Sequence, residues 1–311
     1  MNLENCVQRS ISMSKKVLLI VNPKAGKLKS RRHLFSLVKQ ISLRADVCNM
    51  VMTRRPTDAT AIVEKNHSKY DIIACLGGDG TLNEVITGIM NVQSDISLGF
   101  IPAGTTNDFA RSHQMVRNIR KSADDIMTGE VVALDLGQFE NSYFTYIASI
   151  GAFTAVSYKT PQVAKNALGY GAYLLFSISH FSSLRKHRVT IKSNGESNVE
   201  DVIFLAITNS TSVAGMLKYP KNEVSTDDGL LELLIIRYPK NIYQWFEIVI
   251  ELSKGNYHHP LIEMRSLSSV TIESTEALNW CLDGEFGGAY KKAAIQCLPK
   301  KVNLILNKSS Q

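Results

Sequence analysis

The sequence contains one glycine-rich stretch, residues 76–85 (LGGDGTLNEV), that lies between an apolar run and a helical pattern. The apolar run at residues 70–75 is typical of a buried strand, and the apolar residues from Val85 to Met90 recur at helical spacing. Thr81 and Glu84 have the spacing of a capping box, which predicts that the helix begins directly after Thr81. This part of the chain is therefore expected to form a strand, a glycine turn and a helix in succession.

The composition of the glycine turn favours phosphate binding. Gly77, Gly78 and Gly80 let the backbone approach a bulky anion and adopt positive φ without steric cost. The free N–H groups and the positive end of the helix dipole attract a phosphate. Asp79 would repel phosphate, but it fits the site if it faces a magnesium ion, directly or through water. Taken alone, the stretch is also compatible with a tight turn in which Asp79 is simply solvated.

The first half of the chain alternates strands with helices. Two further loops resemble the glycine turn in their position, one at residues 22–27 after the first strand and one at residues 102–111 after the fourth. Such alternation predicts a parallel α/β sheet, and the loops then open at the carboxyl edge of the sheet, where ligands bind. The expected strands are residues 17–21, 46–52, 70–75 and 97–101, with helices at 30–42 and 59–65.

From Val131 onward the sequence is rich in strand patterns, which we expect at residues 143–148, 189–192 and 202–208. An apolar helix is predicted at residues 161–185; it either packs on the strands or faces a lipid, with the basic residues near 185–188 at its end. Two Asp–Gly pairs, at 228–229 and 283–284, each predict a strand, a turn and a strand. Asp283 and Glu285 would share one face of an extended segment.

Composition sets broad limits on partners and compartment. The 311 residues suit two domains, and the net charge of +7 favours anionic partners, although ordinary surface variation explains it equally well. The five cysteines form no C-x-x-C pair, which is typical of reduced thiols in a cytosolic protein. No apolar run reaches the ~18 residues of a membrane span. The first 16 residues lack the apolar core of a signal peptide, and Met13 is an alternative start of the chain.

Together, residues 22–26 (NPKAG), 77–85 (GGDGTLNEV) and 102–110 (PAGTTNDFA) resemble the bacterial soluble diacylglycerol kinase family, which is related to sphingosine and ceramide kinases and more distantly to NAD kinases. The Asn83-Glu84 pair and the G-T-x-N-D-F stretch favour the lipid kinase branch. The resemblance extends from Lys15 to Asn307. It implies an α/β nucleotide-binding domain at 15–134 completed by a strand at about 300–308, and a β-sandwich domain for the lipid at 135–299. The polar residues before it, 1–14, are expected to form a disordered tail.

The resemblance also implies roles for individual residues. A structural Mg²⁺ would be held by the Asp228 carboxylate and the backbone carbonyls of Ser225 and Leu230; many relatives have Lys or Arg in place of Ser225, which a carbonyl ligand tolerates. A second Mg²⁺ would bridge the phosphates near Asp79, supported through water by Asp135. The expected ATP-binding residues are Asn22, Pro23, Lys24, Ala25, Gly26, Thr53, Gly77, Gly78, Asp79, Gly80, Thr81, Leu82, Asn83 and Thr105.

The reaction implied is transfer of the ATP γ-phosphate to the hydroxyl of diacylglycerol, giving phosphatidic acid. It needs a carboxylate that orients the hydroxyl and accepts its proton. Asp283 and Glu285 are the candidates; the sequence does not decide between them, and Asp283 is preferred. The alternatives are a kinase for a sphingoid base, another lipid alcohol or NAD, and a non-catalytic nucleotide or lipid sensor.

The expected location is the cytoplasm, with peripheral binding at the inner face of the membrane. Family members often form homodimers, but no interface can be identified in the sequence. Nucleic-acid binding is not expected, because the charge is matched by no nucleic-acid-binding module.

Overall fold

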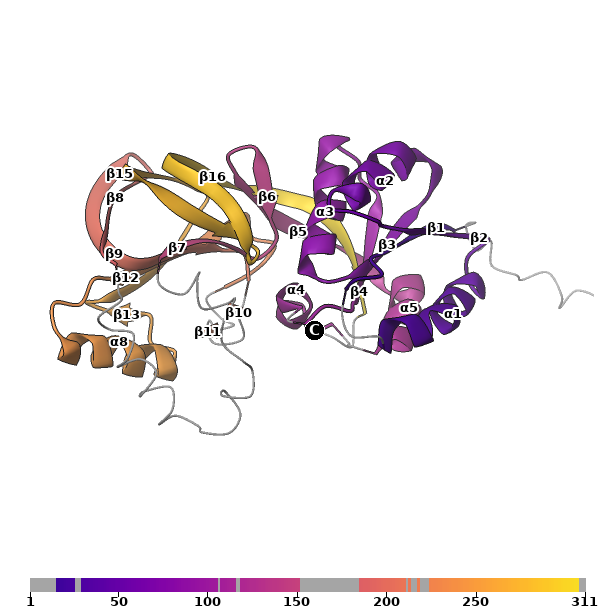
Figure 1. Cartoon of the computed structure of the whole chain (residues 1–311), viewed down its shortest axis with the longest axis horizontal. Coiled ribbons are helices and arrows are strands. Elements are labelled where there is room, and N and C mark those ends of the chain that lie inside the picture. The colour runs from indigo at the N-terminus through magenta and orange to yellow at the C-terminus, as the bar shows by residue number, and fades with distance from the viewer. Residues whose placement is uncertain are drawn as a thin grey trace, which may run out of the picture. The chain divides into compact units, whose positions relative to one another are not determined.

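The computed structural model describes residues 15–25, 29–105, 107–115, 118–151, 185–210, 212–213, 217–218 and 224–307 (Figure 1). The chain divides into two compact units. The first contains the residues up to Thr105, Val116–Val131 and the chain from Leu304 onward, and the second contains Thr106–Met115 and Val132–Asn303. The expected tail at 1–14, Gly26 and the expected helix at 161–185, apart from its last residue, lie outside the described residues. The predicted division after Leu134 stays a prediction.

The first unit is built on a parallel sheet, as the alternating pattern predicts. Its strands are β1 (Lys16–Val21), β2 (Val47–Met52), β3 (Ile72–Gly77) and β4 (Ser97–Pro102), in the order β4-β3-β1-β2. Leu304, near the end of β16 (Glu285–Leu306), pairs in parallel with Leu98 and so adds the last strand to this sheet. The helices are α1 (Lys29–Ser42), α2 (Asp58–Asn66), α3 (Asp79–Asn91) and α5 (Ile119–Thr128), with a short 3-10 turn, η2 (His67–Lys69).

Helices cover both faces of this sheet, α1 and α5 on one and α2 and α3 on the other (Figure 1). The β1 sequence KVLLIV is apolar on both faces, which is typical of a strand in a parallel sheet buried from both sides. Val17, Leu19 and Val21 pack with Leu37 of α1 and Ile126 of α5 in one apolar cluster. This packing fixes the carboxyl ends of β1, β3 and β4, where the expected phosphate loops begin.

The second unit is an antiparallel β-structure. Its strands follow the order β13 (His258–His259), β14 (Ile262–Leu267), β12 (Leu231–Arg237), β9 (Glu196–Thr208), β7 (Ile147–Gly151), β15 (Ser269–Leu282) and β16. Strand β8 (His187–Ser193) pairs with both β9 and β15, and β5 (Glu130–Phe139) pairs with β16 and with β6 (Ser142–Phe144). Two short strands, β10 (Ser212–Val213) and β11 (Leu217–Lys218), pair separately. The strand predicted at 143–148 is divided between β6 and β7.

Alternate residues of β12 face two different cores. Leu231, Leu233 and Ile235 lie in the cluster that includes Trp280, whereas Leu234 and Ile236 lie in the cluster on the opposite face. The opposite face is covered by α8 (Ile242–Lys254), through Trp245, Ile248 and Val249. This helix begins at Asn241, whose side chain accepts a hydrogen bond from the Gln244 N–H at 3.0 Å, and ends at Gly255 in the left-handed conformation. A second, short helix in this unit is α4 (Asp108–Ser112).

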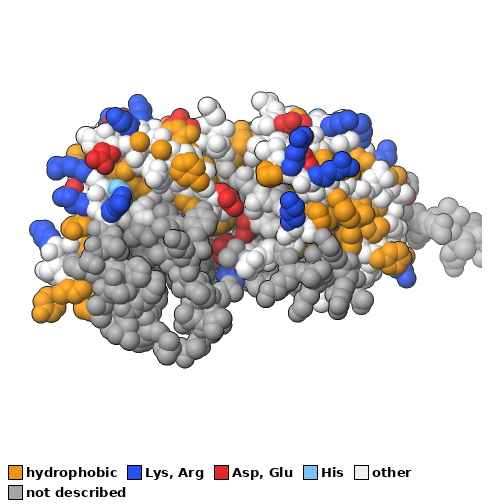
Figure 2. Space-filling model, viewed as in Figure 1, with side chains coloured by type: hydrophobic (Ala, Val, Ile, Leu, Met, Phe, Trp, Pro, Cys, Tyr) orange, Lys and Arg blue, Asp and Glu red, His pale blue; other side chains and the backbone are white. Residues whose placement is uncertain are grey.

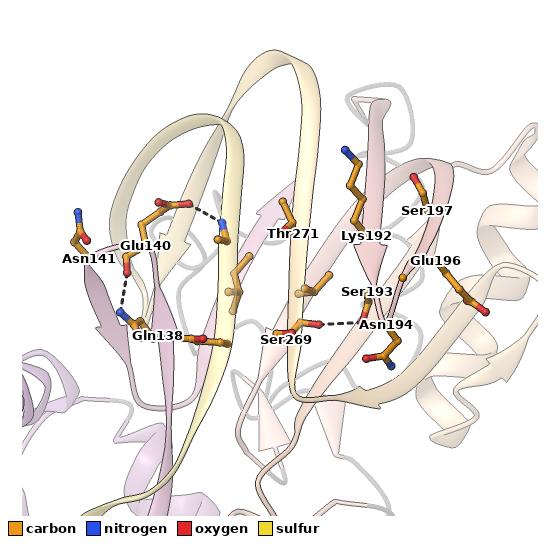
Figure 3. A pocket seen from close by; sticks show the side chains of 15 residues that line it. Gln138, Glu140, Asn141, Lys192, Ser193, Asn194, Glu196, Ser197, Ser269 and Thr271 are labelled. Atoms are coloured by element: carbon orange, nitrogen blue, oxygen red, sulfur yellow. Dashed lines mark hydrogen bonds between the residues drawn. The ribbon is translucent and has the colours of Figure 1, made fainter.

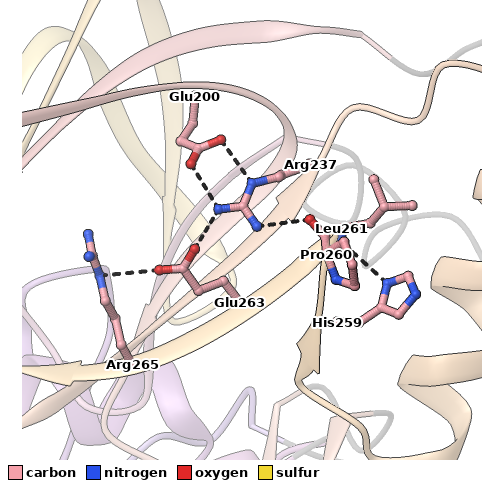
Figure 4. Close-up of polar contacts among 7 residues, drawn as sticks. All are labelled: Glu200, Arg237, His259, Pro260, Leu261, Glu263 and Arg265. Carbon is pink, nitrogen blue, oxygen red and sulfur yellow. Dashed lines mark hydrogen bonds and ion pairs between the residues drawn. The ribbon is translucent and has the colours of Figure 1, made fainter.

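A charged network joins three strands of this unit (Figure 4). The Arg237 guanidinium on β12 donates to both oxygens of Glu200 on β9, at 2.9 and 2.8 Å, and to Glu263 on β14 at 2.5 Å. It also donates to the Pro260 carbonyl at 3.1 Å. Because bidentate Arg–carboxylate pairs fix geometry as well as charge, the network holds the register of the three strands.

None of the helices among the described residues is both long and apolar enough to cross a membrane. Figure 2 shows Lys and Arg side chains on the visible surface of each unit. The cysteines within the described part of the chain, Cys48, Cys75, Cys281 and Cys297, are free thiols, as expected from their spacing.

Candidate active site

The glycine turn joins β3 to α3 as predicted, but the helix begins earlier than the capping box indicates. Gly78, in an extended conformation with φ −96° and ψ −176°, is the N-cap, and α3 begins at Asp79. Thr81 is therefore inside the helix and does not cap it, so the capping-box prediction is wrong. Glu84 contacts α2 instead: its carboxylate accepts from the Ala59 N–H at 3.2 Å, and its carbonyl accepts from the Thr60 hydroxyl at 2.8 Å.

The turn glycines are required by close packing and not by positive φ, because Gly77, Gly78 and Gly80 are absent from the residues with positive φ. A Cβ on Gly77 would lie 2.6 Å from the Thr81 Cβ, and a Cβ on Gly78 would lie 3.2 Å from the Gly104 Cα. A Cβ on Gly80 would meet nothing within 4 Å. Gly77 and Gly78 therefore serve the packing of the loops, whereas Gly80 leaves open space at the start of a helix.

Hydrogen bonds hold three loops side by side at the carboxyl edge of the sheet. The Asn22 side-chain amide donates to the Thr81 hydroxyl at 2.8 Å, and the Asn22 N–H donates to the Leu76 carbonyl at 3.0 Å. On the other side, the Ala103 N–H donates to the Gly77 carbonyl at 2.7 Å. The loops after β1, β3 and β4 thus form one continuous surface, which the sequence pattern predicts from parallel strands.

The other residues expected at the nucleotide lie on or next to this surface. Thr53 follows β2, is buried, and donates its N–H to the Val21 carbonyl at 2.9 Å. Thr105 and Lys24 are exposed, Pro23, Ala25 and Asn83 are half-buried, and Gly26 lies outside the described residues. Leu82 is fully buried, so its side chain belongs to the core and only its backbone is available to a ligand.

Asp79 is the first residue of α3 and is 7% exposed. A carboxylate at this position is stabilised by the positive end of the helix dipole even without a metal. The same helix end is where the sequence predicts phosphate and, with it, a magnesium ion. Asp79 thus fits the expected metal contact, and the helix dipole explains why it is tolerated there.

In the second unit, Asp283 and Gly284 form the two-residue turn between β15 and β16. Both have positive φ, 47° and 89°, as a type I′ hairpin turn requires. The expectation that Asp283 and Glu285 share one face of an extended segment is therefore wrong, because Asp283 is not extended. The turn pattern itself is confirmed.

The Asp283 carboxylate is buried and surrounded by donors. One oxygen accepts from the N–H and the hydroxyl of Thr145, at 2.6 and 2.8 Å, and the other accepts from the N–H groups of Tyr146 and Ile147, at 3.0 and 3.1 Å. Burial raises the pKa of the Asp283 carboxyl, and these hydrogen bonds act in the opposite direction. Glu285, in contrast, is exposed at the first position of β16 and is followed by Phe286, whose side chain is 72% exposed.

The expected metal loop at residues 225–230 is held by Asp135. The two carboxylate oxygens of Asp135 accept from the N–H groups of Gly229 at 2.6 Å and Lys300 at 2.8 Å, and its own N–H donates to the Thr226 carbonyl at 2.9 Å. Both oxygens of Asp135 thus have backbone partners in the second unit. The predicted strand–turn–strand is only partly correct, because residues 224 and 225 precede the turn without forming a strand.

Within this loop the Asp228 side chain is exposed, and one of its oxygens accepts from the Leu230 N–H at 3.0 Å. The Ser225 hydroxyl donates to the Asp227 carboxylate at 2.5 Å. Among the described residues no group of three or more His, Cys, Asp or Glu side chains is arranged to hold a metal ion. A cation here would therefore depend on carbonyl, hydroxyl and amide oxygens beside Asp228, the donor types that Mg²⁺ and Ca²⁺ prefer.

Glu232 lies close to this loop and was not identified from the sequence. It is 1% exposed, and neither carboxylate oxygen has a hydrogen-bond partner within the described part of the chain. Burial, together with the charge of Asp228, raises the pKa of Glu232 to about 8. Burial and the charges of Asp135, Asp228 and Glu232 also raise the pKa of Cys297 to about 12, and the Cys297 thiol donates to the Leu230 carbonyl at 3.8 Å. The sequence LLELL did not indicate a buried carboxylate, because a single Glu among leucines is typical of a strand with one solvent-facing residue.

A polar groove of about 530 Å³ lies elsewhere in the second unit, among β5, β8, β9, β15 and β16 (Figure 3). Its polar lining includes Gln138, Glu140, Lys192 and Asn194. None of the residues predicted for ATP, metal or catalysis lines it, so this groove is not the predicted site.

The α/β unit with its glycine turn and the β-sandwich with its Asp–Gly turn define a two-domain protein of the kinase class. Residues 16–139 match the family model "Diacylglycerol kinase catalytic domain", and residues 147–306 match "YegS C-terminal NAD kinase beta sandwich-like domain". The chain is 31% identical to a diacylglycerol kinase of Bacillus subtilis over 88% of this chain and 91% of that protein, and 31% identical to one of Staphylococcus aureus over 89% and 88%. The chain belongs to the diacylglycerol kinase family and is a kinase.

A solved structure described as a diacylglycerol kinase from Bacillus anthracis has the same fold, with a TM-score of 0.75 at 24% identity over 96% of this chain and 98% of that one. The expected combination of an α/β domain with a β-sandwich is therefore confirmed.

Proposed function

We propose that this kinase transfers the γ-phosphate of ATP to the hydroxyl of diacylglycerol, giving phosphatidic acid. The supporting observation is the geometry at the start of α3. Gly80 leaves open space there beside two closely packed glycines, and hydrogen bonds join the three loops after β1, β3 and β4. Free N–H groups at a helix start bind phosphate, and the missing side chain lets a phosphate approach them. The acceptor is inferred from relatives named diacylglycerol kinase.

The nucleotide would contact the residues predicted from the sequence. Backbone groups of residues 77–83 and of the loop from Asn22 to Gly26 would bind the phosphates, with Thr53 and Thr105 near the rest of the nucleotide. When bound, Mg²⁺ neutralises phosphate charge, and Asp79 is the residue that would hold it. Asp135 is better explained as the anchor of the 225–230 loop, because backbone N–H groups occupy both of its oxygens.

We propose Glu285 as the general base and Asp283 as its positioning residue, reversing the preference based on sequence alone. The Asp283 carboxylate has hydrogen-bond partners on both oxygens, whereas the Glu285 carboxylate is exposed. Glu285 accepts the proton of the lipid hydroxyl while the hydroxyl oxygen of the lipid attacks the γ-phosphorus. The bond from that phosphorus to the β-phosphate oxygen breaks, and ADP leaves with the electron pair.

The structural Mg²⁺ site fits the residues present. Asp228 contributes a carboxylate, Ser225 and Leu230 contribute backbone carbonyls, and Asp135 fixes the loop from behind. The buried oxygens of Glu232, Thr208 and Asn209 that lack hydrogen-bond partners among the described residues support a cation in these surroundings. Such an ion would order the loop and take no part in bond breaking.

A kinase that acts on diacylglycerol must meet its substrate at a bilayer. We propose weak peripheral binding at the inner face of the membrane, with Phe286 beside Glu285 as an apolar contact. Activity on mixed micelles should rise with the content of anionic lipid; a flat response would remove the electrostatic part of this proposal. Homodimer formation stays a prediction.

Transfer of label from ATP with Mg²⁺ tests the reaction and the acceptor together. Diacylglycerol in micelles, a sphingoid base and NAD are offered side by side, with Glu285→Gln as the inactive control. We expect label on diacylglycerol alone. Label on another acceptor would keep the mechanism and change the substrate, and transfer to none of them with ATP still bound would favour a non-catalytic sensor.

A further inference from the structure

A polar row crosses a sheet face of the second unit that is otherwise apolar. Glu232 of β12 is directly opposite Thr208 of β9, and Thr208 is opposite Ile147 of β7. Side chains opposite each other in antiparallel strands lie on the same face. The next residues of β12 on this face, Leu234 and Ile236, belong to the apolar cluster that packs against α8. Glu232 and Thr208 thus introduce oxygen atoms at the edge of an apolar core.

Four side-chain oxygen atoms, in this row and on the adjacent Asn209, lack partners within the described part of the chain. Both Glu232 carboxylate oxygens, the Thr208 hydroxyl and the Asn209 side-chain carbonyl have none, and the three residues are 1%, 0% and 3% exposed. Burying such groups unpaired is costly, and burying a charge unpaired is more so. The Asn209 amide group already donates to the Asp135 carbonyl at 2.7 Å, so its donor is satisfied and only its carbonyl oxygen lacks a partner. What remains is a set of oxygen donors that suits a hard cation.

The same row is connected to the loop at residues 225–230. Asn209 bonds to Asp135, and the Asp135 carboxylate binds the Gly229 N–H. The Leu230 N–H donates to the Asp228 carboxylate at 3.0 Å, and Glu232 follows Leu230 by two residues, so both carboxylates lie near the start of β12. Arg and Lys side chains form no ion pair with Glu232 in the part of the chain that the structure describes. Two acidic groups of the same neighbourhood therefore lack a compensating positive charge.

We propose that Glu232, Thr208 and Asn209 form the inner half of the cation site of loop 225–230, so that one divalent cation is held between Asp228 and Glu232, directly or through its bound water. This inference rests on the proposed structural Mg²⁺ site and extends it from an exposed loop into the sheet. It makes the ion a link between the loop and strands β9 and β12. The ion's affinity then depends on a buried carboxylate that plays no part in phosphoryl transfer.

Calorimetric titration of the full chain with Mg²⁺, in the absence of nucleotide, tests the proposal without any activity readout. Glu232→Gln keeps the shape and removes the charge, and Glu276→Gln makes the same change at an exposed position of β15. We expect Glu232→Gln and Asp228→Asn each to weaken Mg²⁺ binding at least tenfold and to reduce the rise in Tm that Mg²⁺ causes. Glu276→Gln should bind Mg²⁺ as the unmodified chain does.

Two outcomes would overturn the inference in distinguishable ways. In the first, Glu232→Gln binds Mg²⁺ within twofold of the unmodified chain while Asp228→Asn does not. The loop would then bind the cation without Glu232, which is also the result expected if Glu232 is simply a buried, protonated acid. If neither variant changes Mg²⁺ binding, the structural site itself is wrong, while the transfer assay still decides the proposed kinase reaction. Should Glu232→Gln fail to fold, Thr208→Val removes one proposed ligand oxygen at nearly constant shape and should weaken Mg²⁺ binding at least threefold.

Discussion

The Asp283 carboxylate accepts hydrogen bonds from both the N–H and the hydroxyl of Thr145, at 2.6 and 2.8 Å, although the two residues are 138 positions apart. The other carboxylate oxygen binds the next two N–H groups of the chain. The β15–β16 turn is thereby fixed to the segment that enters β7. Because Glu285 is the first residue after this turn, the position of its side chain depends on Asp283.

Asp283→Asn and Glu285→Gln should therefore affect the protein in different ways. An Asn side chain cannot accept from all four donors, so Asp283→Asn should lower the free energy of unfolding by about 3 kcal/mol and also reduce activity. Glu285→Gln changes an exposed group and should leave the free energy of unfolding within about 0.5 kcal/mol while lowering kcat by roughly 10²- to 10⁴-fold. Urea unfolding and steady-state kinetics measure both. An active Glu285→Gln variant would contradict its assignment as the base.

Gly77→Ala and Gly80→Ala separate packing from ligand binding in the phosphate loop. A Cβ at Gly77 would overlap the Thr81 side chain at 2.6 Å, so Gly77→Ala should destabilise the protein by roughly 1–3 kcal/mol. A Cβ at Gly80 meets open space inside a helix, where Ala is favoured over Gly by about 0.8–1 kcal/mol. Gly80→Ala should therefore be as stable as the unmodified chain or more so.

Gly80→Ala is expected to weaken ATP binding although it does not destabilise the fold. The added methyl group would occupy the space through which a phosphate approaches the helix start, and we expect the Kd for ATP to rise at least tenfold. Unchanged ATP affinity in a stable Gly80→Ala variant would show that the phosphates bind elsewhere.

Phe286→Ala tests the apolar contact beside Glu285. Losing partial burial of the ring against lipid, worth about 1 kcal/mol, should raise the apparent KM for micellar diacylglycerol roughly fivefold. The KM for ATP should not change. Tyr243→Ala, which removes an equally exposed aromatic ring from α8 of the same unit, is the matched control. Equal effects of the two substitutions would mean that Phe286 has no specific role.

Protonation linked to His113 is expected to lower the free energy of unfolding in mild acid. The imidazole is partly buried and packs against Phe109 with ring centroids 4.5 Å apart, and burial lowers the pKa of His113 to about 4. The unfolded chain then binds a proton at a higher pH than the folded chain, so stability decreases as pH falls below about 6.5. Between pH 7 and pH 5 this group should account for a loss of about 2 kcal/mol.

Chemical unfolding at the two pH values measures this contribution by comparing the unmodified chain with His113→Gln. The loss between pH 7 and pH 5 should be smaller in the variant. His258→Gln, at an exposed histidine of the same unit, should behave as the unmodified chain does. An identical pH dependence for His113→Gln would contradict the lowered pKa.

Features that depend on local sequence pattern were predictable before the structure was known. Apolar strands such as KVLLIV, the turn at Gly77–Gly78 and the type I′ turn at Asp283-Gly284 are encoded by neighbouring residues, so the parallel sheet, its loops and the last hairpin were predictable. Helix α8 has equally local signals, Asn241 at its start and Gly255 at its end, although it was not predicted.

The roles of the carboxylates, in contrast, depend on long-range contacts and could not be predicted from local pattern. Asp283 and Asp135 bind backbone N–H groups that are far away in the sequence, Glu84 binds α2 instead of capping its own helix, and Glu232 is buried without a partner. Such roles depend on which distant strands lie opposite each other, and residue spacing along the chain does not record that. The residue types at the site could therefore be predicted from the sequence, whereas the role of each residue could be assigned only from its contacts in the folded protein.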